Sequence, residues 1–188
     1  MRLLALTAAA VLLAAPAVAQ APAAAWTVDK AASRVGFRAS MNGDAFDGRF
    51  NRWDARINFD PANLKGSKVV ATIDLASAST GDGARDEALP SSDWFDVKRH
   101  PRATFTTRAI TAAGPNRYVA TGDLSLRGVS RPVSLPFTLA ITGNTAKMTG
   151  AVQLDRTAFG VGQGQWKGTG AIPAKVAVTV QITAKRAG

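Results

Sequence analysis

The stretch Trp53-Asp54-Ala55-Arg56-Ile57-Asn58-Phe59 decides the fold class, because apolar and polar side chains alternate at every position. Alternation with a period of two is typical of a β-strand that buries one face and exposes the other to water. The next four residues, Asp60-Pro61-Ala62-Asn63, favour a turn directly after the strand. The segment therefore predicts a half-buried strand followed by a reversal of the chain.

The same alternation recurs on both sides of this segment. Dipeptides and tripeptides that favour tight turns separate several of the runs, at Asn42-Gly43, Gly114-Pro115-Asn116 and Gly143-Asn144. About eight strands with short connections favour a sandwich or a closed antiparallel barrel. The further predicted strands are Val69–Leu75, Tyr118–Leu124, Val133–Leu139, Ala146–Leu154 and Val176–Ile182, with weaker patterns at Ser33–Ser40 and Ala103–Ile110.

One long segment, residues 81–101, carries charges and aromatic side chains without alternation. Asp82 is a suitable N-cap for a short helix through Ala84–Leu89. The segment is too long for a hairpin turn, and long loops in compact domains are often functional. It is expected to plug or cover one end of the barrel.

The N-terminus has the features of an export signal. Arg2 precedes an apolar run from Leu3 to Ala15, and Ala17-Val18-Ala19 fits a signal-peptidase site. The run is shorter than the roughly 20 residues that cross a bilayer. We therefore predict a signal peptide over residues 1–19, a flexible leader over 20–25, a barrel domain over 26–188, and export to a bacterial periplasm.

The residue inventory argues against catalysis and against a bound metal or cofactor. The chain has no cysteine and a single histidine, His100, which we expect to face solvent. No G-x-S-x-G motif supports a serine nucleophile, and no calcium-loop spacing joins the few carboxylates. We expect Asp86 to pair with Arg85 or another neighbour. The formal net charge of +10 is explained first by solubility and second by affinity for anionic partners such as phosphate head groups, and the basic residues are too scattered for a nucleic-acid site.

Small residues at inward positions of the strands favour an internal cavity. An eight-stranded barrel has an interior that side chains can fill or that one slim ligand can occupy. Alanine and glycine at these positions leave room for the ligand. The small residues expected to face inward are Ala39, Ala55, Ala71, Ala103, Ala120, Gly122, Ala146, Gly150 and Ala177.

The order and spacing of several motifs resemble the YceI family of bacterial periplasmic proteins, over Trp26 to Lys185. The most specific match is residues 122–133, GDLSLRGVSRPV, in which we place Arg127-Gly128 at a hairpin turn and expect Arg131 to pair with Asp123. The other matches are WTVD at 26–29, SRVGF at 33–37, FDGRF at 46–50, Arg85-Asp86 with Leu89, SSDWFDV at 91–97, Pro101, and Phe159-Gly160 after Arg156.

The resemblance implies an extended, lipocalin-like antiparallel barrel with a short helical insertion and a tunnel for a polyprenyl chain, without catalytic residues. Family members often carry histidines where this chain has Met41 and Ala88. Binding of the ligand head group would then fall to Arg85, Asp86 or Arg127, or the ligand would be more apolar. The predicted tunnel residues, including a lid from the inserted segment, are Phe37, Trp53, Ile57, Ile73, Leu89, Trp94, Phe95, Phe105, Leu124, Phe137 and Leu139.

Three functions follow as hypotheses. The first is binding, transport or storage of a long isoprenoid, either a quinone or a polyprenyl phosphate, with peripheral association with the inner membrane and a homodimer as further expectations. The second is an accessory subunit of a membrane quinone or cytochrome system, which predicts an exposed apolar patch. The third is a barrel-based hydrolase, which predicts carboxylates, or His100 with a carboxylate, that converge in a cleft.

Overall fold

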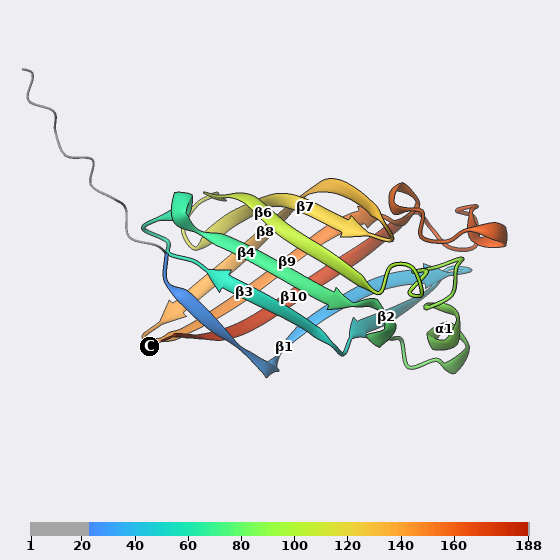
Figure 1. The fold of residues 1–188 in the computed structure, drawn as a ribbon, viewed down its shortest axis with the longest axis horizontal. Coiled ribbons are helices and arrows are strands. Elements are labelled where there is room, and N and C mark those ends of the chain that lie inside the picture. Colours follow the sequence, from blue (N-terminus) through green and yellow to red (C-terminus); the bar gives the residue numbers. More distant parts are fainter. Residues whose placement is uncertain (1–22, 188) are drawn as a thin grey trace, which may run out of the picture.

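Within the described residues, 23–187, the computed structural model is a closed antiparallel barrel of eight strands. Their order around the barrel is β10-β9-β8-β7-β6-β4-β3-β1, and β1 pairs with β10 to complete the circle. The strands run obliquely around the barrel (Figure 1). Their bounds are β1 Ala25–Met41, β3 Trp53–Asn58, β4 Lys68–Asp74, β6 Arg102–Ala112, β7 Arg117–Leu126, β8 Val129–Thr142, β9 Thr145–Asp155 and β10 Lys175–Arg186.

Every strand predicted from alternation is present, because the inward apolar series and the turn residues agree. Asn42 and Gly43 both have positive φ angles, 54° and 91°, as do Arg127 and Gly128, with 50° and 76°. Two consecutive positive φ angles give the type I′ turn whose twist matches a hairpin. These two turns fix the register of the β1–β2 and β7–β8 hairpins.

Two further strands lie outside the barrel circle, and the sequence patterns did not predict them. β2 (Asp44–Phe50) pairs with the second half of β1, and β5 (Ala78–Ser79) pairs with β2. Gly48 interrupts the apolar series of β2 because the ring of Phe37 occupies the space of a side chain: a Cβ on Gly48 would lie 2.1 Å from Phe37 Cζ.

The inserted segment forms α1 (Gly83–Ala88), and Asp82 caps it by accepting a hydrogen bond from Arg85 N at 2.9 Å. This confirms the predicted short helix and its cap. Short 3₁₀ helices occupy Leu64–Gly66, Leu75–Ser77, Arg156–Phe159 and Gly164–Trp166. Together with β2 and the segment after β9, α1 lies at one end of the barrel, and the chain's C-terminus lies at the other (Figure 1). We call the end that carries α1 the helical end.

The predicted leader is only partly outside the described residues, and its described part is packed. Ala23 is buried, Phe59 N donates to Ala24 O at 2.8 Å, and Ala187 N donates to Ala25 O at 2.9 Å. These contacts pack Ala23–Ala25 against the barrel end opposite α1, and the flexibility of the leader stays a prediction. The predicted signal peptide lies outside the described residues. No helix among residues 23–187 has the length and apolarity needed to cross a membrane.

Candidate binding tunnel

Two adjoining apolar cavities run along the interior. The barrel cavity, about 210 Å³, lies among the inward side chains of the barrel strands. The helix-end cavity, about 440 Å³, lies between the barrel and the inserted segment. The two cavities share five lining residues, so they adjoin each other along the interior, and we call the pair the tunnel. The shared residues are Val35, Ile73, Leu124, Leu154 and Val178.

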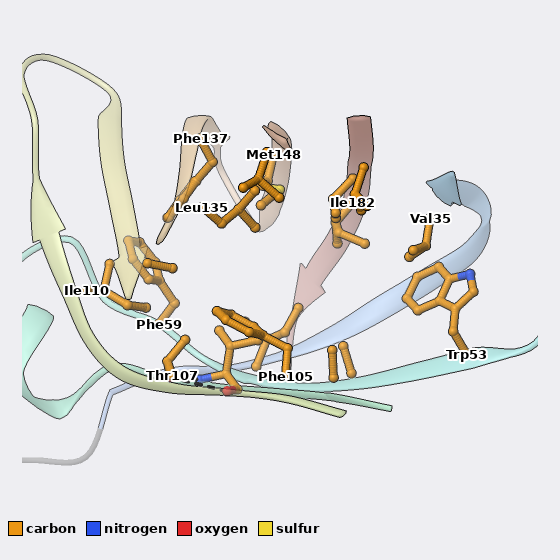
Figure 2. Close-up of a pocket in the computed structure, with 18 of the residues that line it drawn as sticks. Val35, Trp53, Phe59, Phe105, Thr107, Ile110, Leu135, Phe137, Met148 and Ile182 are labelled. Carbon is orange, nitrogen blue, oxygen red and sulfur yellow. Dashed lines mark hydrogen bonds between the residues drawn. The ribbon is translucent and has the colours of Figure 1, made fainter. Parts of the chain in front are cut away.

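The barrel cavity has an apolar wall because its few polar atoms are already hydrogen-bonded. Thr107 Oγ1 accepts from Val69 N at 2.8 Å and donates to Val69 O at 3.2 Å, in place of a β4–β6 backbone pair (Figure 2). Trp26 Nε1 donates to Phe59 O at 2.9 Å. A ligand in this cavity therefore meets hydrocarbon and aromatic surface from both walls, as Figure 2 shows for Phe105 and Phe137.

Aromatic side chains close the end of the barrel cavity away from α1. The rings of Phe59 and Tyr118 meet edge to face at 5.4 Å, and Tyr118 stacks on Phe137 at 5.4 Å. Trp26 and Phe59 are both buried in the same cluster. Such pairs are favourable beyond the area that they bury, so aromatic packing stabilises this end of the barrel.

Around the helix-end cavity, the wall is also mainly apolar, and its aromatic side chains come from separate elements. Trp94 and Trp166 lie 5.8 Å apart between ring centroids, and Phe50 lies 5.5 Å from Phe37 and 6.0 Å from Phe95. Thr80, Asp82, Arg85 and Arg156 are the polar residues of this wall.

All eleven predicted tunnel residues line these cavities. Contact with a ligand stays a prediction for each of them. The barrel cavity is lined by Trp53, Ile57, Phe105, Phe137 and Leu139, the helix-end cavity by Phe37, Leu89, Trp94 and Phe95, and both by Ile73 and Leu124. Met41 and Ala88, the two positions where the family resemblance led us to expect histidine, also line the helix-end cavity.

Of the three predicted head-group residues, Arg85 alone lines a cavity. Its guanidinium pairs with Asp82 at 3.6 Å and lies 4.5 Å from the centroid of the Phe46 ring. Arg127 Nη2 donates to Ser92 O at 2.7 Å, which ties the β7–β8 hairpin to the inserted segment. Arg85 therefore lies in the wall of the helix-end cavity, whereas Arg127 holds the β7–β8 hairpin against the inserted segment.

Asp86 has a structural role at the start of the inserted segment. It accepts hydrogen bonds from Ser79 Oγ at 2.8 Å, Thr80 N at 2.6 Å and Thr80 Oγ1 at 2.7 Å, so the expected pair with Arg85 is wrong. Desolvation raises the pKa of Asp86, but the hydrogen bonds from Thr80 and Ser79 outweigh it and hold the pKa below its ordinary value.

One other expected contact and one expected exposure also need correction. Asp123 pairs with Arg108 rather than with Arg131, because Arg108 stands at a bulge of β6 beside Asp123. Arg131 Nε instead donates to Ala158 O at 2.6 Å. His100 is half-buried against Gly128, where a Cβ would lie 2.6 Å from His100 Cε1, and so does not simply face solvent.

Most of the predicted small inward residues do line the tunnel, and Ala177 does not. It stands between Val176 and Val178, both of which line the helix-end cavity, so its side chain points to the opposite face of β10. Gly122 and Gly150 are absent from the cavity walls and serve close backbone approach instead, since a Cβ on Gly122 would lie 2.3 Å from Thr106 O.

A buried arginine, Arg156, is the site residue that sequence reasoning missed. It is 4% exposed and lines the helix-end cavity, yet no carboxylate among the described residues forms an ion pair with it. Its guanidinium donates to four backbone oxygens, of Val161, Gly168, Ile172 and Pro173, at 2.7–3.1 Å. Burial lowers the pKa of Arg156, and Asp155 partly opposes this shift.

The arrangement offers little for hydrolysis. Asp82 is the one carboxylate in the walls of the two tunnel cavities within residues 23–187, whereas acid–base hydrolysis of a glycoside needs two that face each other. The described residues hold no group of three potential metal-ligating side chains of His, Cys, Asp or Glu. The geometry suits enclosure of an apolar ligand.

Comparison with known proteins agrees with this architecture. The model of the YceI-like domain family matches residues 26–184. A UPF0312 protein of Pseudomonas savastanoi pv. phaseolicola is 35% identical over 122 residues, which cover 63% of this chain and 64% of that protein. The chain therefore spans just under two thirds of the length of this relative.

Solved structures show the same fold. BcnA of Burkholderia cenocepacia superposes with a TM-score of 0.82 at 35% identity, covering 85% of this chain and all of that one. A polyisoprenoid binding domain from Saccharophagus degradans, implicated in plant cell wall breakdown, superposes with a TM-score of 0.66 at 14% identity, covering 87% of this chain and 99% of that one.

Proposed function

Because this chain belongs to the YceI-like domain family, we propose that it binds a long apolar isoprenoid in its tunnel, without catalysis, and carries or stores it in the periplasm. The observation that supports this most is that two apolar cavities, the barrel cavity and the helix-end cavity, adjoin each other at five shared apolar residues. The structural similarity to a polyisoprenoid binding domain points to the same class of ligand.

The energetics favour a tail with repeated apolar units. Each isoprene unit that leaves water for an apolar cavity contributes roughly 3–4 kcal/mol, at about 0.8 kcal/mol per buried methylene-sized group. The walls offer this gain without a desolvation penalty, since Thr107 and Trp26 keep their hydrogen bonds inside the protein. Selectivity along the tail is then loose, and polar groups outside the apolar walls set the preference for a head group.

The direct test is organic extraction of the purified protein, followed by mass spectrometry. The proposal expects an isoprenoid at a constant molar ratio to protein. Ala71 faces the barrel cavity, and Thr72, its neighbour on β4, does not line the tunnel, so they form a matched pair. Ala71→Trp should abolish the co-purified lipid, and Thr72→Trp should retain it.

The stability of both variants is measured alongside, by thermal unfolding. A folded Ala71→Trp protein that still carries the full amount of lipid would show that the barrel cavity is not the binding site. The proposed function itself would be overturned by two results together. The purified wild-type protein would carry no lipid, and wild-type protein incubated with isoprenoids and then separated from unbound lipid would also carry none.

A further inference from the structure

The barrel wall has a seam where β1 changes its neighbour. On one side, β1 pairs with β3 only at Ala25 and Trp26, and its pairing with β2 begins at Gly36. Residues 27–35 of β1 therefore have no backbone partner on that side among the described strands. Figure 1 shows β1 bending sharply between its two halves. The seam is the part of the wall with the weakest connection between neighbouring strands.

The bend is built by a defined set of hydrogen bonds. The register of β1 against β10 shifts between Asp29 and Arg34. Asp29 Oδ1 accepts from Ala31 N at 3.1 Å and from Ala32 N at 3.2 Å, and Ser33 Oγ donates to Asp29 O at 2.6 Å. Asp and Ser side chains commonly stabilise such local turns. These bonds hold the exposed residues 30–32 in a hydrogen-bonded turn.

A third cavity, which we call the side cavity, opens at this seam and has a different chemistry. Its volume is about 680 Å³, and its wall combines the β1 bulge, the β2–β3 turn and Gln181. Four cationic side chains line it, from Lys30, Arg34, Arg49 and Arg52, and no carboxylate does. The side cavity is therefore suited to an anion.

Two of these cations are available for a ligand. Lys30 pairs with Asp54 at 2.8 Å, and Arg52 pairs with Asp74 at 2.9 Å. Arg34 and Arg49 form no ion pair with any residue in 23–187. Guanidinium groups bind phosphate oxygens through paired, charge-assisted hydrogen bonds.

The side cavity adjoins the tunnel through two aromatic residues. Trp53 lines both the side cavity and the barrel cavity, and Phe50 lines both the side cavity and the helix-end cavity. Lys30 Nζ lies 4.0 Å from the centroid of the Trp53 ring and donates to Trp53 O at 2.6 Å. In Figure 2 the indole nitrogen of Trp53 lies on the side of the ring that points away from the other labelled residues.

We propose that the side cavity binds the phosphate or diphosphate head group of an isoprenyl phosphate, with Arg34 and Arg49 as its main ligands. The tail enters the tunnel at the seam beside Trp53. This inference rests on the proposed function for the tail and adds a site for the head group. The head-group site then lies at the side of the barrel rather than at the helical end, where Arg127 and Asp86 are held by protein contacts.

The test compares two lipids with the same tail, geranylgeranyl diphosphate and geranylgeraniol, by isothermal titration of the whole mature protein. The double variant Arg34→Gln/Arg49→Gln removes the two unpaired cations. The charge-matched control is Arg56→Gln/Arg117→Gln, since both arginines are exposed and line none of the three cavities. Inorganic diphosphate is titrated as the free anion.

The side-cavity variant should bind geranylgeranyl diphosphate about tenfold more weakly or worse, with geranylgeraniol unchanged. The control variant should bind both lipids as the wild type does. Undiminished binding of geranylgeranyl diphosphate by the side-cavity variant, or an equal loss in the control, would overturn the head-group site while leaving tail binding intact. If inorganic diphosphate bound as tightly as the lipid, the site would be one for a free anion. If the wild-type protein bound neither lipid, the proposed function itself would be refuted.

Discussion

Replacement of Arg156 by methionine tests the most unusual feature of the helical end. The segment after β9 returns over the helix-end cavity and contributes Val161, Trp166 and Ile172 to its wall. Arg156 holds this segment by donating to the carbonyls of Val161 at 2.8 Å, Gly168 at 2.9 Å and Ile172 at 2.7 Å, and to that of Pro173 at 3.1 Å. Methionine keeps an unbranched apolar stem but lacks the guanidinium group, and so removes every donor.

The expected loss can be worked out from these contacts. The bonds to Val161 O and Ile172 O are buried, whereas the other two are partly exposed and their acceptors can turn to water. A buried carbonyl left without a donor costs about 1–3 kcal/mol. Removal of an unpaired buried cation offsets part of that cost. We expect a net loss of about 3 kcal/mol in the free energy of unfolding, from the two buried carbonyls and the loosened segment.

Urea unfolding, monitored by tryptophan fluorescence, measures this loss of stability. Amide hydrogen exchange shows whether the loss of protection is greatest in residues 160–174. Arg131→Met is the control, because Arg131 is exposed and donates a single bond to Ala158 O, and it should cost no more than about 1 kcal/mol. The Arg156 variant should also release bound lipid faster. A free energy of unfolding within about 0.5 kcal/mol of the wild type would refute the reasoning.

Two further predictions concern the scaffold. Gly122→Ala should destabilise the protein by about 1–3 kcal/mol, because the new Cβ would lie 2.3 Å from Thr106 O and 2.9 Å from Thr107 Cα, both backbone atoms. The control in the same thermal unfolding experiment is Gly83→Ala, whose new Cβ would have no neighbouring atom within 4 Å. Equal melting temperatures for the two variants would contradict the prediction. The folded-state pKa of Asp86 lies below its ordinary value of 3.8, so its contribution to stability is present above pH 3.8 and is lost as the pH falls through the lowered pKa. In urea titrations, the free energy of unfolding should fall less between about pH 5 and about pH 3 for Asp86→Asn than for the wild type. Equal falls would count against this role of Asp86.

The barrel strands could be predicted because the inward side chains alternate and the turn residues agree with them. β2 escaped prediction for a local reason, the glycine at position 48 that accommodates the ring of Phe37. The tunnel residues followed from the same alternation, since an inward position on a barrel strand faces either packed side chains or a cavity.

The polar features of the site could not be predicted in the same way. Charged residues are rarely buried, so nothing in the local sequence marks Arg156 as a side chain 4% exposed. The side cavity joins Arg34 of β1 to Arg49 of β2 across a bend, and its position depends on strand pairing rather than on spacing. The one local signal was Asp29 followed by Ser33, which form the turn at the bulge.

Introducing a histidine at Ala88, where the family resemblance led us to expect one, tests whether a polar group in the helix-end cavity changes the choice of ligand. Ala88 ends α1 and lines that cavity together with Met41. In Ala88→His, the imidazole would supply an N–H donor to a cavity wall that is mainly hydrocarbon, and an acceptor on a ligand could satisfy it. We expect a quinone with a geranyl tail to bind roughly three- to tenfold more tightly than to the wild type, as for one net hydrogen bond of about 1 kcal/mol, while geraniol gains less. Ala88→Leu is the apolar control measured in the same fluorescence titration. Should histidine and leucine shift the two affinities alike, a polar contact at this end would play no part in the choice of ligand, and head-group recognition would have to lie elsewhere, as the cationic wall of the side cavity suggests.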